Sequence, residues 1–280
     1  MNGSGQRALV LGGGGVAGVG WEAGLLDGLR AAGVDLAAAD VIVGTSAGSI
    51  IGSYLASGAD PAAVVERMAE ADADAPRTVV DMDRVMTAMA ITFDESIEPQ
   101  ERRAQVGRMA IEAVPDHDAA VRDSGVRDLV PWPDWPERRL LVTAVDATDG
   151  AFTVWEAGSG VPLPDAVASS CAVPCAFPPV TINGRPYVDG GVRSGTNADL
   201  AAGAATVVVV VPLAHLVPRA FALDRELAEL DGAQVVTVGP DDASVAAFGD
   251  DVLDRAVGKP AFAAGRAQAA AVAAEIAAVW

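Results

Sequence analysis

The sequence predicts a single α/β domain that spans residues 1–280 and has a mainly parallel central sheet. Three observations predict this fold class. Short apolar runs, typical of buried strands, alternate with longer segments of helical character. The run of five valines that follows Thr206 is typical of a central strand covered on both faces. Hydrophobic residues make up 51% of the 280 residues, which is enough to fill one large core.

The first fifty residues are expected to form two strand–helix units. Ala8–Leu11 is a short apolar strand that leads into four consecutive glycines. A helix is expected from about Gly20 to Ala32, because Gly33 is a typical residue after a helix end. Val41–Val43 is the second strand, and a tight turn leads from it into a helix that ends near Gly58.

A helical insertion is expected at about 60–136. Pro61 suits the first turn of a helix, with Asp60 as its cap. Strand signals disappear beyond this point, and the composition becomes charged and helical. A loop rich in proline and tryptophan at 130–136 returns the chain to the core.

Strands are expected again at 140–145, 152–155, 180–182, 187–188, 206–211 and 234–238. Asn183-Gly184 between two short apolar runs predicts a hairpin. A helix is expected after Pro164, ending before Pro174. The alanine-rich tail at 260–280 is expected to form a closing helix.

The charge of the chain excludes some partners. Lys and Arg number 19 against 38 Asp and Glu, so the formal net charge is −19. A surface this acidic repels phosphate backbones, and we expect no nucleic-acid binding. It also disfavours docking by charge onto strongly anionic membranes. A neutral or zwitterionic lipid surface, a micelle or a monomeric ester stays open as a partner, and nothing indicates an oligomeric state.

The two cysteines and the pattern of apolar residues indicate in which cellular compartment the protein is expected. Cys171 and Cys175 do not make a disulfide framework in a chain of this length, and without neighbouring histidines we expect no metal site. The N-terminus lacks the pattern of a signal peptide. No uninterrupted apolar run approaches the ~20 residues of a spanning helix. These observations predict a cytoplasmic protein.

The strongest local signal is the sequence VIVGTSAG from Val41 to Gly48. A G-x-S-x-G between a buried strand and a helix is typical of a nucleophile elbow. Gly44 and Gly48 remove side chains that would collide in so tight a turn, and Ser46 is presented above the sheet. The following helix directs its N–H groups toward charge that develops there. A glycine-rich turn capped by serine is the alternative.

The glycine run at 12–15 has two interpretations. Successive amides without side chains can surround an anion, either a pyrophosphate or a tetrahedral oxyanion. Gly13, Gly15 and Gly18 match the spacing of a dinucleotide fingerprint. That fingerprint expects an acidic residue at the end of the second strand, whereas Asp40 lies before it. The oxyanion interpretation is therefore favoured, and no cofactor is expected.

A serine nucleophile needs a base, and three residues are candidates. His117 lies in the helical insertion, and His215 follows the valine run. A histidine triad is disfavoured because Ser46 lies after the second strand, earlier than in an α/β-hydrolase. Asp189 ends a short strand and is followed by two glycines, which allow a sharp turn and close approach of another loop.

Taken together, the glycine loop, GTSAG and DGG, in that order, resemble the patatin-like phospholipase family. The stretch from Ala168 to Pro174 supports the resemblance, which covers about 9–57 and 140–212. The resemblance implies a three-layer α/β/α fold and a serine–aspartate dyad in a lipid acyl hydrolase. Ser46 would be the nucleophile and Asp189 the general base.

The resemblance also implies supporting roles. Backbone amides of Gly13, Gly14 and Gly15 would hold the oxyanion. Gly190 and Gly191 would shape the turn after the base. An acyl-serine intermediate would then pass to water or to another alcohol. A non-catalytic module of similar architecture that binds lipid or nucleotide is the alternative function.

One position departs from the family pattern. The loop of the family commonly carries a basic residue where this chain has Ala17, so a local positive charge is lost. Arg193 is a candidate to compensate, unless it has a structural or solvated role. The apolar patch Val85–Phe93 is expected to pack in the core, with an interfacial lid as the alternative.

Overall fold

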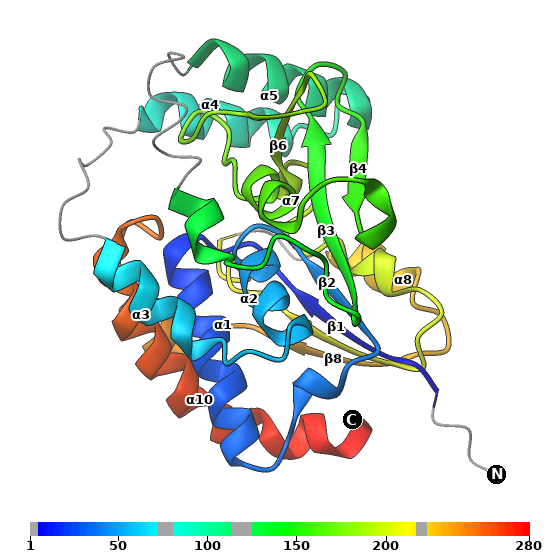
Figure 1. The fold of residues 1–280 in the computed structure, drawn as a ribbon, viewed down its shortest axis with the longest axis vertical. Coiled ribbons are helices and arrows are strands. Elements are labelled where there is room, and N and C mark those ends of the chain that lie inside the picture. The colour runs from blue at the N-terminus through cyan, green and yellow to red at the C-terminus, as the bar shows by residue number, and fades with distance from the viewer. Residues whose placement is uncertain (1–4, 72–80, 114–124, 217–222) are drawn as a thin grey trace.

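The computed structural model describes residues 5–71, 81–113, 125–216 and 223–280. Its centre is one mixed sheet of eight strands (Figure 1). The strands are β1 (Arg7–Leu11), β2 (Val41–Gly44), β3 (Arg139–Asp146), β4 (Phe152–Trp155), β5 (Val180–Ile182), β6 (Arg185–Asp189), β7 (Thr206–Val210) and β8 (Gln234–Val238). All eight coincide closely with the strands expected from the sequence.

Hydrogen-bonded neighbours in the sheet follow the path β5-β6-β3-β2-β1-β7-β8, and β4 pairs with β3 outside this path. The five strands from β3 to β8 in this order run parallel. Strands β4, β5 and β6 are joined by antiparallel pairs. The prediction of a mainly parallel sheet is therefore confirmed, with an antiparallel extension at one edge.

Helices cover both faces of the sheet and one end. They are α1 (Gly15–Ala31), α2 (Ala47–Ala56), α3 (Ala62–Ala71), α4 (Met82–Thr92), α5 (Pro99–Ala113), α7 (Leu163–Ser170), α8 (Leu223–Ala228), α9 (Asp242–Phe248) and α10 (Gly258–Val279). Figure 1 shows α1, α3 and α10 together on one side, α8 on the other, and α4 and α5 beside the upper end of β3. The arrangement is a three-layer α/β/α fold.

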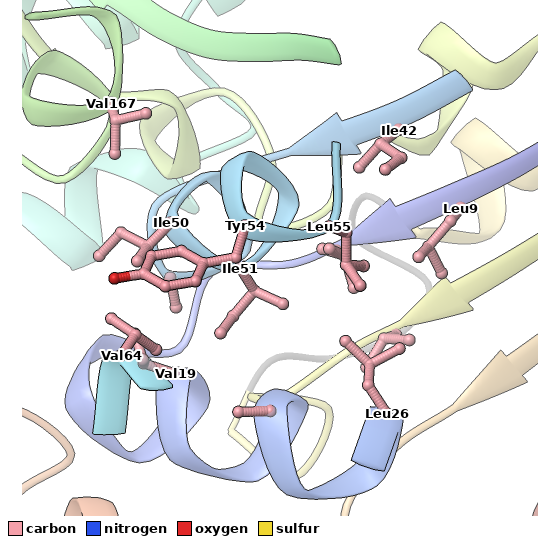
Figure 2. Close-up of a cluster of buried hydrophobic side chains, with 14 of the residues drawn as sticks. Leu9, Val19, Leu26, Ile42, Ile50, Ile51, Tyr54, Leu55, Val64 and Val167 are labelled. Atoms are coloured by element: carbon pink, nitrogen blue, oxygen red, sulfur yellow. The ribbon is translucent and has the colours of Figure 1, made fainter. Parts of the chain in front are cut away.

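Successive side chains along each strand point to opposite faces of the sheet, so the sheet has a separate hydrophobic core on each face. Leu9 and Leu11 of β1 face the layer of α1, α2 and α10, whereas Ala8 and Val10 face the layer of α8. In Figure 2, Leu9 and Ile42 from the sheet lie opposite Leu26 of α1, with the apolar side chains of α2 between them. Val207–Val210 are fully buried and serve both cores, as the valine run predicts.

Helix α1 begins at Gly15, five residues earlier than the sequence predicts. Its glycines lower intrinsic helix propensity, and for this reason the sequence pattern predicts a later start. They allow α10 to approach closely instead: a methyl group on Gly24 would lie 2.0 Å from the carbonyl oxygen of Phe262. Packing against α10 therefore favours a helix where local propensity does not.

The apolar character of α10 is a further finding. Among the described residues, one helical stretch, Arg255–Val279, is long and apolar enough to cross a membrane by length and composition. In this structure it lies along α1, where Gly265 packs against the backbone at Trp21. Its buried face is thus part of the domain core.

The described part of the insertion is helical, as expected. Val85 and Ala88 of α4 are buried in a cluster with α5 and the upper ends of β3 and β6. Met86 and Met89 are exposed on the other side of the same helix. The patch at 85–93 therefore packs in the core with one face and presents methionines with the other.

Candidate active site

Ser46 lies between the end of β2 and the start of α2 in a strained backbone conformation. Its φ is 53° and its ψ is −119°, which a residue with a side chain adopts only when its surroundings impose it. The amide of Ser46 donates to the Oγ of Ser170 at 2.9 Å. This is the strand–turn–helix geometry that the sequence predicts around GTSAG.

The two glycines of that motif are required by space. A methyl group on Gly48 would lie 2.1 Å from the carbonyl oxygen of Leu11, and one on Gly44 would lie 2.6 Å from the Cα of Ser49. Neither approach is compatible with a side chain. The elbow therefore fits against the end of β1 because positions 44 and 48 are bare.

Asp189 lies at the end of β6, and β3 brings it to the elbow. On β3, Val142 is opposite Gly44 of β2, and Ala144 is opposite Asp189 of β6. Val142 and Ala144 both pair with β4 as well, so β4 occupies one edge of β3 along this stretch. Strands β2 and β6 must therefore share the opposite edge of β3. The two strands run toward each other and end two residues apart, about 7 Å along β3.

The carboxylate of Asp189 is enclosed. The residue is 5% exposed, and its Oδ1 accepts a hydrogen bond from the Gly191 amide at 2.7 Å. Burial raises the pKa of Asp189 to about 6, while the nearby Ser46 hydroxyl and the Gly191 amide act in the opposite direction. A carboxylate with this pKa is a better proton acceptor than a free aspartate and is still mainly ionised at neutral pH.

The glycine loop lies beside Ser46. A methyl group on Gly13 would be 3.4 Å from the Cβ of Ser46. The Gly13 amide, however, donates to the carbonyl of Gly195 at 2.7 Å, so it is occupied by the protein itself. Within the described residues, the amides of Gly14 and Gly15 at the start of α1 have no backbone acceptor, so these two are the remaining candidates of the loop for an oxyanion.

Arg193 does not replace the missing basic residue at position 17. Its guanidinium binds both carboxylate oxygens of Asp199, at 2.9 and 2.6 Å, and lies over the ring of Phe152. A third bond at 2.7 Å goes to the Oδ1 of Asn197. These contacts give Arg193 a structural role in the loop that follows Asp189.

The space near Ala17 is also filled. Ala17 is fully buried, and its amide donates to the carbonyl of Val252 at 3.0 Å. A methyl group on Gly15 would lie 2.8 Å from that same carbonyl oxygen. A segment from the C-terminal part of the chain therefore covers the start of α1 around position 17.

Of the two histidines considered as bases, the structure describes only His215. His215 follows β7 and contacts the ring of Phe248 at 5.8 Å between centroids; burial lowers the pKa of its imidazole. His117 lies outside the described residues. Asp40, the residue considered for a dinucleotide, accepts the amide of Arg7 at the opposite end of β2.

Both cysteines are free thiols. The Sγ of Cys171 lies 3.8 Å from the Oγ of Ser49, and burial raises the pKa of this thiol. Cys171 is therefore an inert neighbour of the elbow at neutral pH. Across the described residues, no group of three or more His, Cys, Asp or Glu side chains could hold a metal ion.

The family of the chain is shown by a match between its sequence and a family model. The family model described as "Patatin-like phospholipase" matches residues 9–202, which include the glycine loop, the elbow and Asp189. The chain belongs to the patatin-like phospholipase family. No curated protein matches the sequence.

Two solved structures are similar to this patatin-like chain. One is VipD from Legionella pneumophila, with 14% identity, a TM-score of 0.39, and coverage of 88% of this chain and 54% of VipD. The other is the type III effector protein ExoU, with 17% identity, a TM-score of 0.40, and coverage of 98% and 53%. This patatin-like chain spans about half the length of each.

Proposed function

We propose that this protein is a lipid acyl hydrolase of the esterase or phospholipase A type, with Ser46 as nucleophile and Asp189 as general base. The observation that carries the proposal is the meeting of β2 and β6 on one edge of β3, which brings a strained serine beside a buried carboxylate. Membership of the patatin-like phospholipase family supports a lipid ester as substrate.

In the first half-reaction, the Oγ of Ser46 attacks the carbonyl carbon of the ester while its proton passes to Asp189. The negative charge moves to the carbonyl oxygen, where the amides of Gly14 and Gly15 and the N-terminus of α1 stabilise it. When the tetrahedral intermediate collapses, the carbon–oxygen bond to the leaving alcohol breaks. The alcohol takes the proton from Asp189, and an acyl-serine remains.

In the second half-reaction, Asp189 accepts a proton from water as the water attacks the acyl carbon. Collapse of this intermediate returns the proton to the Oγ of Ser46 and releases the carboxylic acid. The whole cycle needs no group beyond the dyad, the amides and water. An alcohol in place of water would give acyl transfer, which product analysis with added alcohol detects.

The activity is proposed to reside in one domain of 280 residues, with cytoplasmic location as its setting. The substrate is a lipid or small ester, taken from solution or from a neutral membrane or micelle surface. The net charge of −19 is the reason that anionic surfaces and nucleic acids are unfavourable partners.

The test is covalent labelling with a fluorophosphonate, read by peptide mass spectrometry on the wild type, Ser46→Ala and Asp189→Asn. We expect the label on Ser46 of the wild type, no label at that position in Ser46→Ala, and labelling of Asp189→Asn slowed by roughly 10²–10⁴-fold. Folded wild type that stays unlabelled, with and without lipid vesicles, would favour a non-catalytic lipid-binding protein of the same fold.

A further inference from the structure

The turn that follows Asp189 makes contact with each of the other two segments of the site. Gly195 accepts the amide of Gly13 from the glycine loop at 2.7 Å. Two residues later, Asn197 donates from its Nδ2 to the Oγ1 of Thr45 at 3.0 Å, directly before Ser46. One short stretch of chain thus touches the oxyanion loop and the elbow and is continuous with Asp189.

Asn197 is fully buried and adopts a left-handed conformation, with φ of 52°. Besides Thr45, its Nδ2 donates to the carbonyl of Ser194 at 2.8 Å. The Oγ1 of Thr45 is in turn 2.8 Å from the Oγ1 of Thr143, the β3 residue between the two positions that pair with β2 and β6. The Asn197 side chain is therefore connected, through Thr45 and Thr143, to the place on β3 where the ends of β2 and β6 meet.

The orientation of the Asn197 amide is fixed chemically. Arg193 donates to it at 2.7 Å, and a guanidinium has only donors, so the atom that faces Arg193 is the oxygen Oδ1. The nitrogen must then point toward Thr45. Asp199 holds the guanidinium in turn through two hydrogen bonds.

The residues on both sides of Asn197 are bound by one carboxylate, one through its side chain and the other through its backbone amide. Oε2 of the buried Glu226 in α8 accepts the Oγ1 of Thr196 at 2.6 Å and the amide of Ala198 at 2.9 Å. These two hydrogen bonds hold the turn directly before and after Asn197. They restrict the left-handed backbone of Asn197, so its side chain is held in one position against Thr45.

We propose that Asn197 is a positioning residue of this site, which holds Thr45 and so fixes the Ser46 hydroxyl against Asp189 and the glycine loop. The inference rests on the proposed function, because it concerns the same nucleophile and base. It adds a residue that touches neither the substrate nor the reacting atoms but sets the distance between them. A misplacement of about 1 Å is enough to slow an enzyme roughly a hundredfold.

The experiment measures the rate of fluorophosphonate labelling of Ser46, from pH 5 to 9, in Asn197→Gly and in Gln268→Ala. Glycine keeps the left-handed backbone and removes only the side chain. Gln268 is the matched control, a buried amide bonded to Trp21 at 2.9 Å and to the Gly239 carbonyl at 2.7 Å. Both variants should lose thermal stability.

We expect Asn197→Gly to label Ser46 roughly ten- to hundredfold more slowly, and Gln268→Ala to label at the wild-type rate. The pH midpoint of Asn197→Gly should also move upward, because a displaced Ser46 hydroxyl no longer favours ionised Asp189. Equal rates and midpoints in Asn197→Gly and wild type would overturn the proposal, as would equal slowing in both variants.

A second pair of variants tests the same bond from its other end, in case Asn197→Gly does not fold. Thr45→Ser keeps the hydroxyl that Asn197 binds, and Thr45→Val replaces it with a methyl group. We expect Thr45→Ser to label near the wild-type rate and Thr45→Val at least tenfold more slowly. Equal rates in the two would refute the role of Asn197. A wild type that is not labelled at all would instead contradict the proposed function.

Discussion

A methyl group on Gly190 would lie 2.1 Å from the Oγ1 of Thr143. The bare backbone after Asp189 is therefore in contact with β3 at the residue between the partners of Gly44 and Asp189. This contact lets the chain turn sharply after the carboxylate without leaving the sheet. The absence of a side chain at the first glycine of DGG thus helps to place Asp189 beside the elbow.

Gly190→Ala should disrupt this arrangement. Overpacking against Thr143 costs about 1–3 kcal/mol and displaces either the turn or the threonine, so we expect labelling of Ser46 to fall roughly tenfold or more. Gly158→Ala is the matched control, because nothing lies within 4 Å of its added methyl group and the residue is outside the site. Similar losses in both variants would show that the contact at Thr143 has no special role.

The sequence predicts the strands and the elbow well because both are local patterns. The eight apolar runs, the glycines of GTSAG and the hairpin at Asn183-Gly184 each depend on residues close together in the chain. The meeting of β2 and β6 on one edge of β3 is not local. It brings together residues about 145 positions apart, and only the family resemblance indicated it.

Residues that act through distant partners escaped the sequence analysis for the same reason. Asn197 bonds to Thr45, 152 positions away, and no motif at either position announces that contact. The free or occupied state of the Gly13 amide depends on the carbonyl of Gly195. Arg193 differs, because its partner Asp199 is only six positions away, yet the spacing alone does not show that the two side chains pair.

The pH dependence of the activity should reflect Asp189. Its pKa is raised to about 6 by burial, and only the ionised carboxylate can accept the proton of Ser46. We expect the labelling rate of the free enzyme to rise with pH, with a midpoint near 6, and to level off above about pH 7. A rate that is flat between pH 4.5 and 8, in protein that stays folded, would exclude Asp189 as the base.

The same pKa predicts a cost in stability. A carboxyl whose pKa is raised on folding is fully tolerated below the unfolded value, and stability is lost as pH rises toward the folded value. For Asp189 the window is between 3.8 and about 6. That shift corresponds to about 3 kcal/mol.

Asp189→Asn should therefore become more stable relative to wild type as the pH rises, by up to about 3 kcal/mol between pH 4 and pH 8. Asparagine can still accept the Gly191 amide through its oxygen. Urea unfolding of both proteins at the two pH values measures the change. A stability difference that does not vary with pH would mean that the carboxyl is not buried as described.

Glu22 offers a test away from the dyad. It lies in α1, is fully buried, and both its carboxylate oxygens lack a hydrogen-bond partner. Burial raises the pKa of Glu22 well above its ordinary value; the nearby Gly12 amide has a smaller, opposing effect on this pKa, and its own hydrogen bond goes to the Val210 carbonyl at 3.0 Å. An unpaired carboxylate would be costly here, so the side chain is expected to be neutral in the folded protein.

Glu22→Gln removes the proton equilibrium and keeps the shape of the side chain. As the pH rises above the unfolded value near ~4.3, the wild type loses stability because folding must either bind a proton or bury a charge. The variant lacks this loss, so its free energy of unfolding should increase relative to wild type from pH 4 to pH 8. Asp189 titrates in both proteins and cancels in the difference. Parallel stability curves across this range would show that Glu22 has an ordinary pKa, and that water or another polar group reaches its carboxylate inside the helix layer.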